Sequence, residues 1–200
     1  MTAIPVDDTI EYPDSNGEPT AETSLHLKEL VRALEGLEEH FRDTPDTLVA
    51  ASLPLYYQEG DPEAVVTPDL MVVEQVEPKP RRKYLLWEEE MAPSCVLELT
   101  SRNRSKKDLG IKKELYERLG VDEYFLFDPH REALTPPLQG FRLTEGRYKP
   151  IRPEPDGTLV SLMLGVVLAA AGKHLRLTDI ATGSPLLDRE ETEELIGFEL

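Results

Sequence analysis

Apolar side chains repeat at helical spacing over residues 22–42, directly after an N-terminal segment that has no such pattern. Within that range the apolar positions recur every three or four residues, at Leu27, Leu30, Val31, Leu34, Leu37 and Phe41. Pro45 lies just beyond their end. The spacing predicts a first amphipathic helix. Residues 1–21 are rich in Pro, Asp, Asn and Gly, so we expect an extended or flexible arm there.

Three strand-like runs follow, each rich in β-branched, aliphatic or aromatic residues: residues 47–57, 65–73 and 95–100. A second helix is predicted over residues 106–119. Ser105 and Asp108 resemble a capping box at its start, and Gly120 is a suitable C-terminal stop. Residues 123–127 are typical of a further strand. The predicted order of elements is α-β-β-β-α-β.

The C-terminal part of the chain is predicted to add to the same core. Residues 141–151 alternate around Glu145-Gly146, which indicates a hairpin. Residues 159–170 are strongly apolar and too short to span a membrane, so we expect a buried strand or helix. The acidic tail at residues 188–200 is expected to be a solvated helix or a disordered end.

Length and composition favour a single domain, over residues 22–187. The chain has 200 residues, 40% hydrophobic and 30% charged, which is enough to bury one core. No long apolar stretch or secretory signal is visible, so we expect a cytoplasmic protein without a membrane span. Cys95 is the single cysteine, and the four histidines lack ligand spacing, which excludes disulfides and makes a zinc site improbable.

The net charge of −17 argues against a protein that coats nucleic acid by electrostatics alone. Residues 79–113 are the exception, because they carry 10 basic and 5 acidic side chains. This basic segment overlaps the candidate chemistry described below, as a phosphate-facing surface should. Solvated loop charges are an equally simple explanation and stay open at this point.

Two carboxylates interrupt otherwise apolar strands. Asp69 lies within the run at residues 65–73, although Pro68-Asp69 could also mark a turn with Asp69 exposed. Strand alternation puts Cys95, Leu97 and Leu99 on one face and Val96, Glu98 and Thr100 on the other. If the two strands pair, Asp69 and Glu98 converge, and their oxygens suit Mg²⁺ or Mn²⁺.

The second predicted helix brings a cation toward these carboxylates. Asp108, Lys112 and Tyr116 fall on one stripe, while Ile111, Leu115 and Leu119 form an adjacent apolar stripe that should pack on the sheet. Lys112 would then border the sheet. The alternative is an ordinary surface pair of Lys112 with Asp108, the latter serving only as a helix cap.

Together these residues carry a resemblance to a known family. Pro68-Asp69, the run at 96–101, the run at 108–116 and the run at 120–129 are similar in sequence and spacing to the Uma-type restriction endonuclease family of the PD-(D/E)XK superfamily. The resemblance covers about residues 11–187. It implies an α/β (α+β) restriction endonuclease-like core, with a central mixed β-sheet flanked by helices and with C-terminal β additions.

The resemblance also implies metal-dependent hydrolysis of phosphodiester bonds, most simply in DNA. Asp69, Glu98 and the backbone carbonyl of Leu99 would hold Mg²⁺ or Mn²⁺, and Glu22 resembles an extra acidic ligand. The position two after Glu98 is Thr100 where the superfamily usually has lysine, and the catalytic lysine maps to Lys112. The remaining site residues have two roles: Arg102, Arg104, Lys106 and Lys107 would hold the nucleic-acid backbone, and Thr100, Asp108 and Tyr116 would support the site.

Two other functions remain open for this sequence. The domain could be an inactive nuclease fold that serves binding or assembly, which the acidic surface would suit. Alternatively the same residues could hydrolyse a substrate that is not a nucleic acid, which a net charge of −17 would tolerate better. Engagement of two DNA strands suggests a homodimer, since two-fold pairing is the commonest closed assembly.

Overall fold

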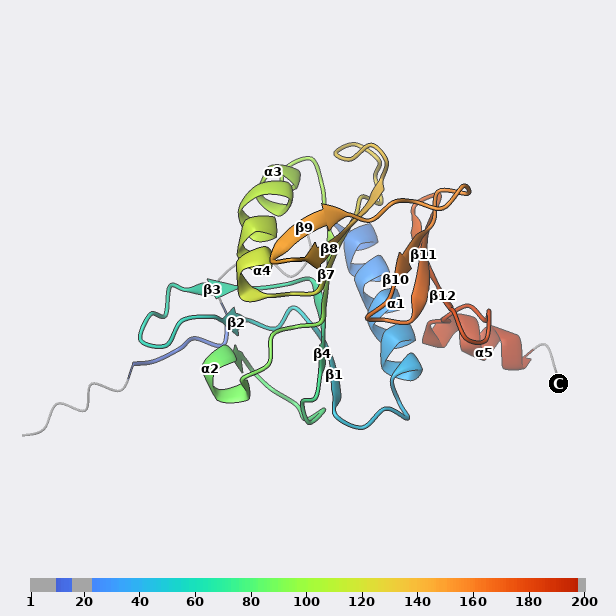
Figure 1. Cartoon of the computed structure of the whole chain (residues 1–200). Helices are drawn as coiled ribbons and strands as arrows, with labels where there is room; N and C mark the ends of the chain where they lie inside the picture. Colours follow the sequence, from blue (N-terminus) through green and yellow to red (C-terminus); the bar gives the residue numbers. More distant parts are fainter. Residues whose placement is uncertain (1–9, 16–22, 198–200) are drawn as a thin grey trace, which may run out of the picture.

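The computed structural model describes residues 10–15 and 23–197, arranged around a six-stranded sheet (Figure 1). The strands lie in the order β1-β4-β6-β7-β8-β9. Their bounds are β1 (Thr47–Ala51), β4 (Leu70–Glu74), β6 (Cys95–Leu99), β7 (Glu123–Phe127), β8 (Leu138–Thr144) and β9 (Arg147–Pro150). Within this sheet β6 and β7 run parallel, and the other neighbours are antiparallel. The predicted mixed central sheet is confirmed.

A helical crossover joins the two parallel strands, because a tight turn cannot connect parallel neighbours. It consists of α3 (Ser105–Lys107), the π-helical turn η1 (Asp108–Lys112) and α4 (Lys113–Leu119), and it ends at Gly120 with a φ of 82°. This crossover covers one face of the sheet, and α1 (Ser24–His40) covers the other (Figure 1). The predicted flanking helices are therefore present.

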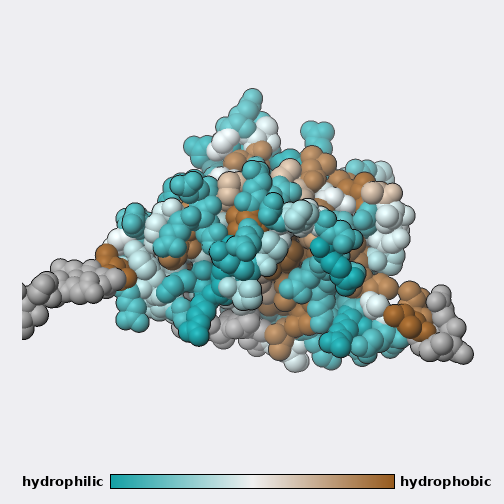
Figure 2. Space-filling view, turned by 90° about the horizontal axis from the view of Figure 1, so that it is seen from below, coloured by the Kyte–Doolittle hydropathy of each residue, from teal (hydrophilic) through white to brown (hydrophobic). Residues whose placement is uncertain are grey.

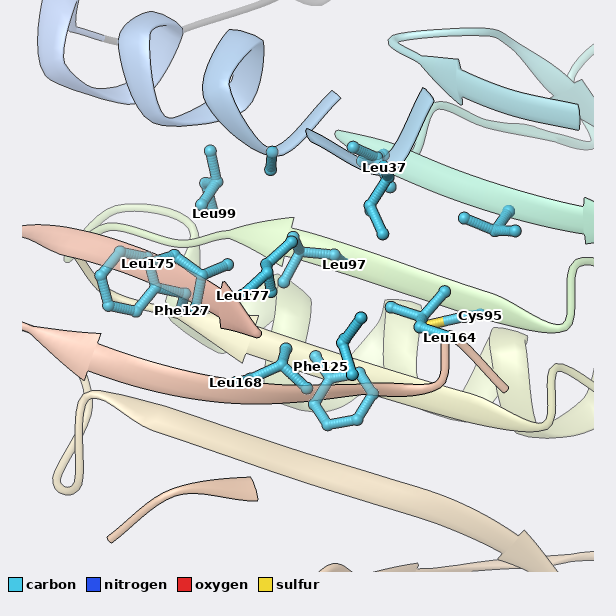
Figure 3. Packing of buried hydrophobic residues seen from close by; sticks show 14 of the residues in the cluster. Leu37, Cys95, Leu97, Leu99, Phe125, Phe127, Leu164, Leu168, Leu175 and Leu177 are labelled. Atoms are coloured by element: carbon cyan, nitrogen blue, oxygen red, sulfur yellow. The ribbon is translucent and has the colours of Figure 1, made fainter. Parts of the chain in front are cut away.

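Strand alternation along β6 separates two hydrophobic cores. Cys95, Leu97 and Leu99 pack with α1 and with the C-terminal strands, as Figure 3 shows. Val96 belongs to the second core, together with Leu115 and other residues on the crossover side. Full burial of such aliphatic side chains contributes about 1.5–3 kcal/mol each. The predicted division of β6 into two faces is confirmed.

The C-terminal additions are strands. β8 and β9 form the predicted hairpin, with positive φ of 55° at Glu145 and 74° at Gly146, as a type I′ turn requires. A separate three-stranded sheet packs on the α1 side: β10 (Leu159–Ser161), β11 (Val166–Ala171) and β12 (His174–Asp179). The chain then forms α5 (Arg189–Gly197), which leaves Leu195 and Ile196 exposed. Figure 2 shows hydrophobic atoms at this end of the molecule, as well as in patches elsewhere on the same face.

Two predicted strands are wrong as single elements. The run at 47–57 divides into β1 and β2 (Leu55–Tyr56), and the run at 65–73 divides into β3 (Val65–Val66) and β4. Positive φ at Ser52 breaks the first run, and Pro68, which has no N–H for a ladder, interrupts the second. The separated strands β2 and β3 form a small sheet with β5 (Tyr84–Leu85), in the order β3-β2-β5. The chain continues from β5 directly into α2 (Leu86–Glu89).

None of the helices in residues 10–15 and 23–197 combines the length and the apolar character that a membrane span requires.

Candidate active site

The two predicted carboxylates meet where β4 begins and β6 ends, at the upper end of the sheet in Figure 1. Leu70 pairs with Leu97, so the next step along this antiparallel register sets Asp69 beside Glu98. The N-terminal end of α1 and the start of α3 flank this position from the two faces of the sheet (Figure 1). The sheet register therefore brings the two acids together.

Asp69 is buried, with 3% of its surface exposed. Its Oδ2 accepts a hydrogen bond of 2.8 Å from the backbone N–H of Leu99, and its Oδ1 lies 3.3 Å from Nη1 of Arg104. Burial alone would raise the pKa of Asp69, but His26, Arg104 and Lys112 face the carboxylate and lower its pKa overall. The alternative of an exposed turn residue is wrong.

Glu98 is fully buried and accepts hydrogen bonds from two side chains of the crossover. Nζ of Lys112 lies 2.8 Å from Oε1 and 2.7 Å from Oε2, and the Tyr116 hydroxyl donates to Oε1 at 2.8 Å. Burial has the largest effect on the pKa of this carboxyl group. Burial, with the nearby charges of Asp69 and Asp108, outweighs the attraction of Lys112 and raises the pKa of Glu98 to about 8.

Lys112 is a buried cation, only 1% exposed, and not a surface residue. Its Nζ also donates to the carbonyl of Thr67 at 3.3 Å and lies 3.9 Å from Oδ1 of Asp108. Burial lowers the pKa of Lys112, but Glu98 and the other carboxylates raise it overall, so the ammonium stays protonated. The alternative of a solvated pair with Asp108 is wrong.

The π-helical turn explains which residues of the crossover face the sheet. A π turn holds more residues than an α turn, and such turns are frequent at functional sites. Asp108 and Lys112, the ends of η1, are both buried, whereas Ile111 is 71% exposed. The predicted packing of Ile111 on the sheet is therefore wrong, although Leu115 of the same predicted stripe is buried.

Asp108 does not cap the helix, which corrects a second prediction. Its Oδ2 accepts a hydrogen bond of 2.5 Å from the Thr100 hydroxyl, and its backbone carbonyl accepts one of 3.0 Å from Tyr124. Ser105 does not act as the N-cap either, because it is the first residue of α3. Burial raises the pKa of Asp108, against the opposing effects of Lys112 and Thr100. Asp108 thus ties the start of the crossover to the end of β6.

The basic residues near the site divide into two kinds. Arg104 turns inward: it lies 3.3 Å from Asp69 and 4.0 Å from Glu98. The side chain of Arg102 is 75% exposed, and Lys106 and Lys107 are exposed as well. Four basic residues predicted to share one role therefore occupy different environments.

His26 belongs to the site although the sequence showed no ligand spacing for it. Thr23 caps α1 by accepting a hydrogen bond from the His26 backbone N–H. The His26 side chain is 3% exposed, and its Nε2 lies 3.5 Å from Oδ2 of Asp69. The missed signal was its place on the buried α1 stripe that continues through Leu30, Ala33 and Leu37.

The donors at this site fit a hard divalent cation. Two buried carboxylates supply oxygen ligands, and Nε2 of His26 is buried without a hydrogen-bond partner among the described residues. That part of the chain contains no group of three His, Cys, Asp or Glu side chains already gathered as a finished metal site. Arg104 faces both carboxylates, and Glu22, predicted as an extra ligand, lies outside the described residues.

Comparisons with known proteins agree with this architecture. One similar solved structure is titled as that of "a putative nuclease belonging to DUF820" from Anabaena variabilis ATCC 29413. It is 15% identical, the match covers 78% of each chain, and the TM-score is 0.53, so the likeness shows the fold alone. No curated protein matches the chain. The sequence profile of the Uma2 family matches residues 3–171, and the protein therefore belongs to this family, described as "Putative restriction endonuclease".

Proposed function

We propose that this protein is a metal-dependent endonuclease that hydrolyses phosphodiester bonds of nucleic acid, with DNA as its substrate. One observation carries the proposal. Asp69 and Glu98 are buried side by side, and a buried lysine, Lys112, contacts both oxygens of Glu98. Buried charges are costly unless they are paired or used, and perturbed groups gather at functional sites. Membership of the Uma2 family supports the same activity.

Asp69, Glu98, the Leu99 carbonyl and His26 are the residues proposed to hold Mg²⁺ or Mn²⁺. Such an ion, when bound, acts as a Lewis acid on a phosphoryl oxygen and lowers the pKa of water. Leu99 also positions Asp69, because its N–H donates to Oδ2 and leaves Oδ1 directed elsewhere. Glu22 remains a prediction as a further carboxylate.

Lys112 is proposed as the catalytic lysine. Its ammonium group is charged and held in place by Glu98 and the Thr67 carbonyl, so it is preorganised before substrate arrives. A fixed cation in a water-poor site can orient the attacking water and offset charge that develops on the phosphoryl group. Tyr116 and the Asp108-Thr100 pair hold Glu98 and the crossover in position for this role.

Arg102, Lys106 and Lys107 are proposed to hold the backbone of the nucleic acid. Their exposure at the start of the crossover, next to the buried site, supports this role. Phosphate contacts position a duplex without reading its sequence, and they make binding weaken as salt increases. The overall charge of −17 would repel DNA elsewhere, so the basic segment would also orient the approach.

A metal titration against a substrate panel tests the proposed function. The purified protein is incubated with duplex DNA, single-stranded DNA and RNA at several concentrations of Mg²⁺ and Mn²⁺. We expect cleavage of DNA that requires the ion and that a chelator abolishes. Cleavage of RNA alone would change the substrate, and no cleavage of any nucleic acid would favour an inactive binding module or a different substrate.

A homodimer is the assembly we propose for cleavage of two strands, because each protomer carries one site. Light scattering with and without duplex DNA measures the mass directly. A monomer under both conditions would refute the dimer and leave the single site unaffected.

A further inference from the structure

Arg104 faces the carboxylate oxygens that a bound ion would need. Three of the four oxygens of the pair already have other donors: Oδ2 of Asp69 accepts from the Leu99 N–H, Oε1 of Glu98 accepts from Tyr116 and Lys112, and Oε2 of Glu98 accepts from Lys112. Arg104 lies 3.3 Å from the fourth oxygen, Oδ1 of Asp69, and 4.0 Å from Oε2 of Glu98. Its guanidinium therefore donates to the one oxygen of the pair for which the described residues provide no other donor.

Arg104 is also the least buried member of the cluster. Its side chain is 15% exposed, whereas those of Asp69, Glu98 and Lys112 are 4%, 0% and 2% exposed. It belongs to the turn at residues 102–104 that leads from β6 into α3, and it is not part of the sheet. The guanidinium can leave the acids by side-chain rotation at this surface turn, without disturbing the strands that hold them.

Charge makes Arg104 and a divalent ion competitors for this place. A doubly charged ion beside a guanidinium would meet strong repulsion in surroundings with little water. We propose that Arg104 is a displaceable internal cation: it neutralises Asp69 and Glu98 when the ion is absent, and ion binding releases it toward a substrate phosphate. This inference rests on the proposed function and names a regulation of that same site.

The released guanidinium has a suitable new partner. Arginine binds phosphate through two parallel hydrogen bonds, and the exposed Arg102 and Lys106 lie within two residues of it along the chain. Arg104 would thus act as a positioning residue that joins the basic surface only when the ion is bound. The arrangement would couple ion binding to substrate binding, because each would favour the outward arginine.

Arg104→Gln separates this inference from a purely structural role. We measure Mn²⁺ affinity by calorimetry on the full chain without DNA, and then the cleavage rate of duplex DNA at saturating Mn²⁺. Arg104→Gln should bind Mn²⁺ about tenfold more tightly, because its competitor is gone, and cleave about tenfold more slowly, because the phosphate loses a partner. Arg102→Gln removes the same charge two residues away and should leave Mn²⁺ affinity within about twofold.

Opposite changes in affinity and rate are the signature of the proposal. Unchanged or weaker Mn²⁺ binding by Arg104→Gln, with normal binding by the wild type, would overturn it and leave the proposed function standing. Absence of Mn²⁺ binding in every protein would overturn the proposed function and this inference with it. If Arg104→Gln does not fold, Arg104→Lys carries the test: it keeps the charge but reaches less far across the two acids, and should bind Mn²⁺ more tightly than the wild type.

Discussion

Nζ of Lys112 lies 2.8 Å and 2.7 Å from the two carboxylate oxygens of Glu98, and both side chains are excluded from solvent. Such a buried pair adds little to the free energy of unfolding, because the cost of desolvating the two groups offsets most of their attraction. It is better suited to chemistry, where a fixed charge costs no rearrangement during the reaction. The burial of this pair is therefore the reason for proposing Lys112 as a catalytic lysine rather than a structural one.

Replacement of Lys112 by Met is predicted to reduce the cleavage rate by on the order of a hundredfold or more, as the loss of one preorganised stabiliser does. Because Lys112 is buried, we also expect a loss of about 1–3 kcal/mol in the free energy of unfolding. The loss is limited because Glu98, whose pKa is already raised to about 8, can take up a proton. Chemical denaturation and single-turnover cleavage measure the two effects.

Lys113 provides the matched control. It is the next residue of the crossover, and its Nζ lies 3.8 Å from the centre of the Phe141 ring. Lys113→Met should cost about 0.5–1 kcal/mol of cation-π stabilisation and leave the cleavage rate near that of the wild type. Equal rate losses in the two variants would mean that the basic segment only attracts substrate.

His26→Gln is predicted to weaken Mn²⁺ binding about 10- to 100-fold while the fold persists. The physical reason is that the buried Nε2 of His26, which has no hydrogen-bond partner among the described residues and lies 3.5 Å from Oδ2 of Asp69, is available as a ligand. Calorimetric titration measures the affinity. The control is His174→Gln, on β12, which should leave the Mn²⁺ affinity unchanged. If His26→Gln also leaves the affinity unchanged, His26 is not a metal ligand.

Metal affinity is predicted to depend on pH through Glu98. Burial raises its pKa to about 8, so a proton competes with an ion for this carboxylate as the pH falls below that value. The logarithm of the Mn²⁺ association constant should therefore rise by about one for each pH unit from 6 to 8, and level off above. A constant affinity over this range would show that Glu98 is already ionised.

Tyr116→Phe tests the protonation of Glu98 through one of its hydrogen-bond donors. The Tyr116 hydroxyl donates to Oε1 of Glu98 and so stabilises the ionised form. Its removal should move the midpoint of the Mn²⁺ affinity profile upward by about one pH unit, with little change in the affinity reached above that midpoint. A midpoint that stays in place would assign Tyr116 to packing alone.

Much of the fold was predictable because its signals are local. The alternation along residues 95–100 predicts both β6 and the opposite faces of Leu97 and Glu98, since each step along a strand reverses the side-chain direction. Gly120 likewise predicts the end of the crossover, because it accepts the left-handed conformation. The convergence of Asp69 and Glu98 follows from the pairing of two such strands.

The rest of the site depends on contacts that no local pattern encodes. His26 approaches Asp69 from a helix 43 positions earlier in the sequence, so only the packing of α1 on the sheet brings the two together. Arg104 and Arg102 are the same residue type in the same turn, yet only Arg104 turns toward the acids. The π turn at residues 108–112, in which Asp108 and Lys112 are buried and Ile111 is exposed, has no signature in the apolar spacing of the sequence.

The initial rate of plasmid DNA cleavage in Mg²⁺ by the wild type and by Asp69→Asn, purified in parallel, tests whether the buried carboxylates bind a catalytic ion. Asparagine keeps an oxygen that can accept from the Leu99 N–H, so the variant should fold while losing the charge that an ion requires. The proposed metal-dependent mechanism predicts chelator-sensitive cleavage by the wild type and a rate at least about a hundredfold lower for Asp69→Asn. No cleavage by the wild type, or equal rates in the two proteins, would contradict it.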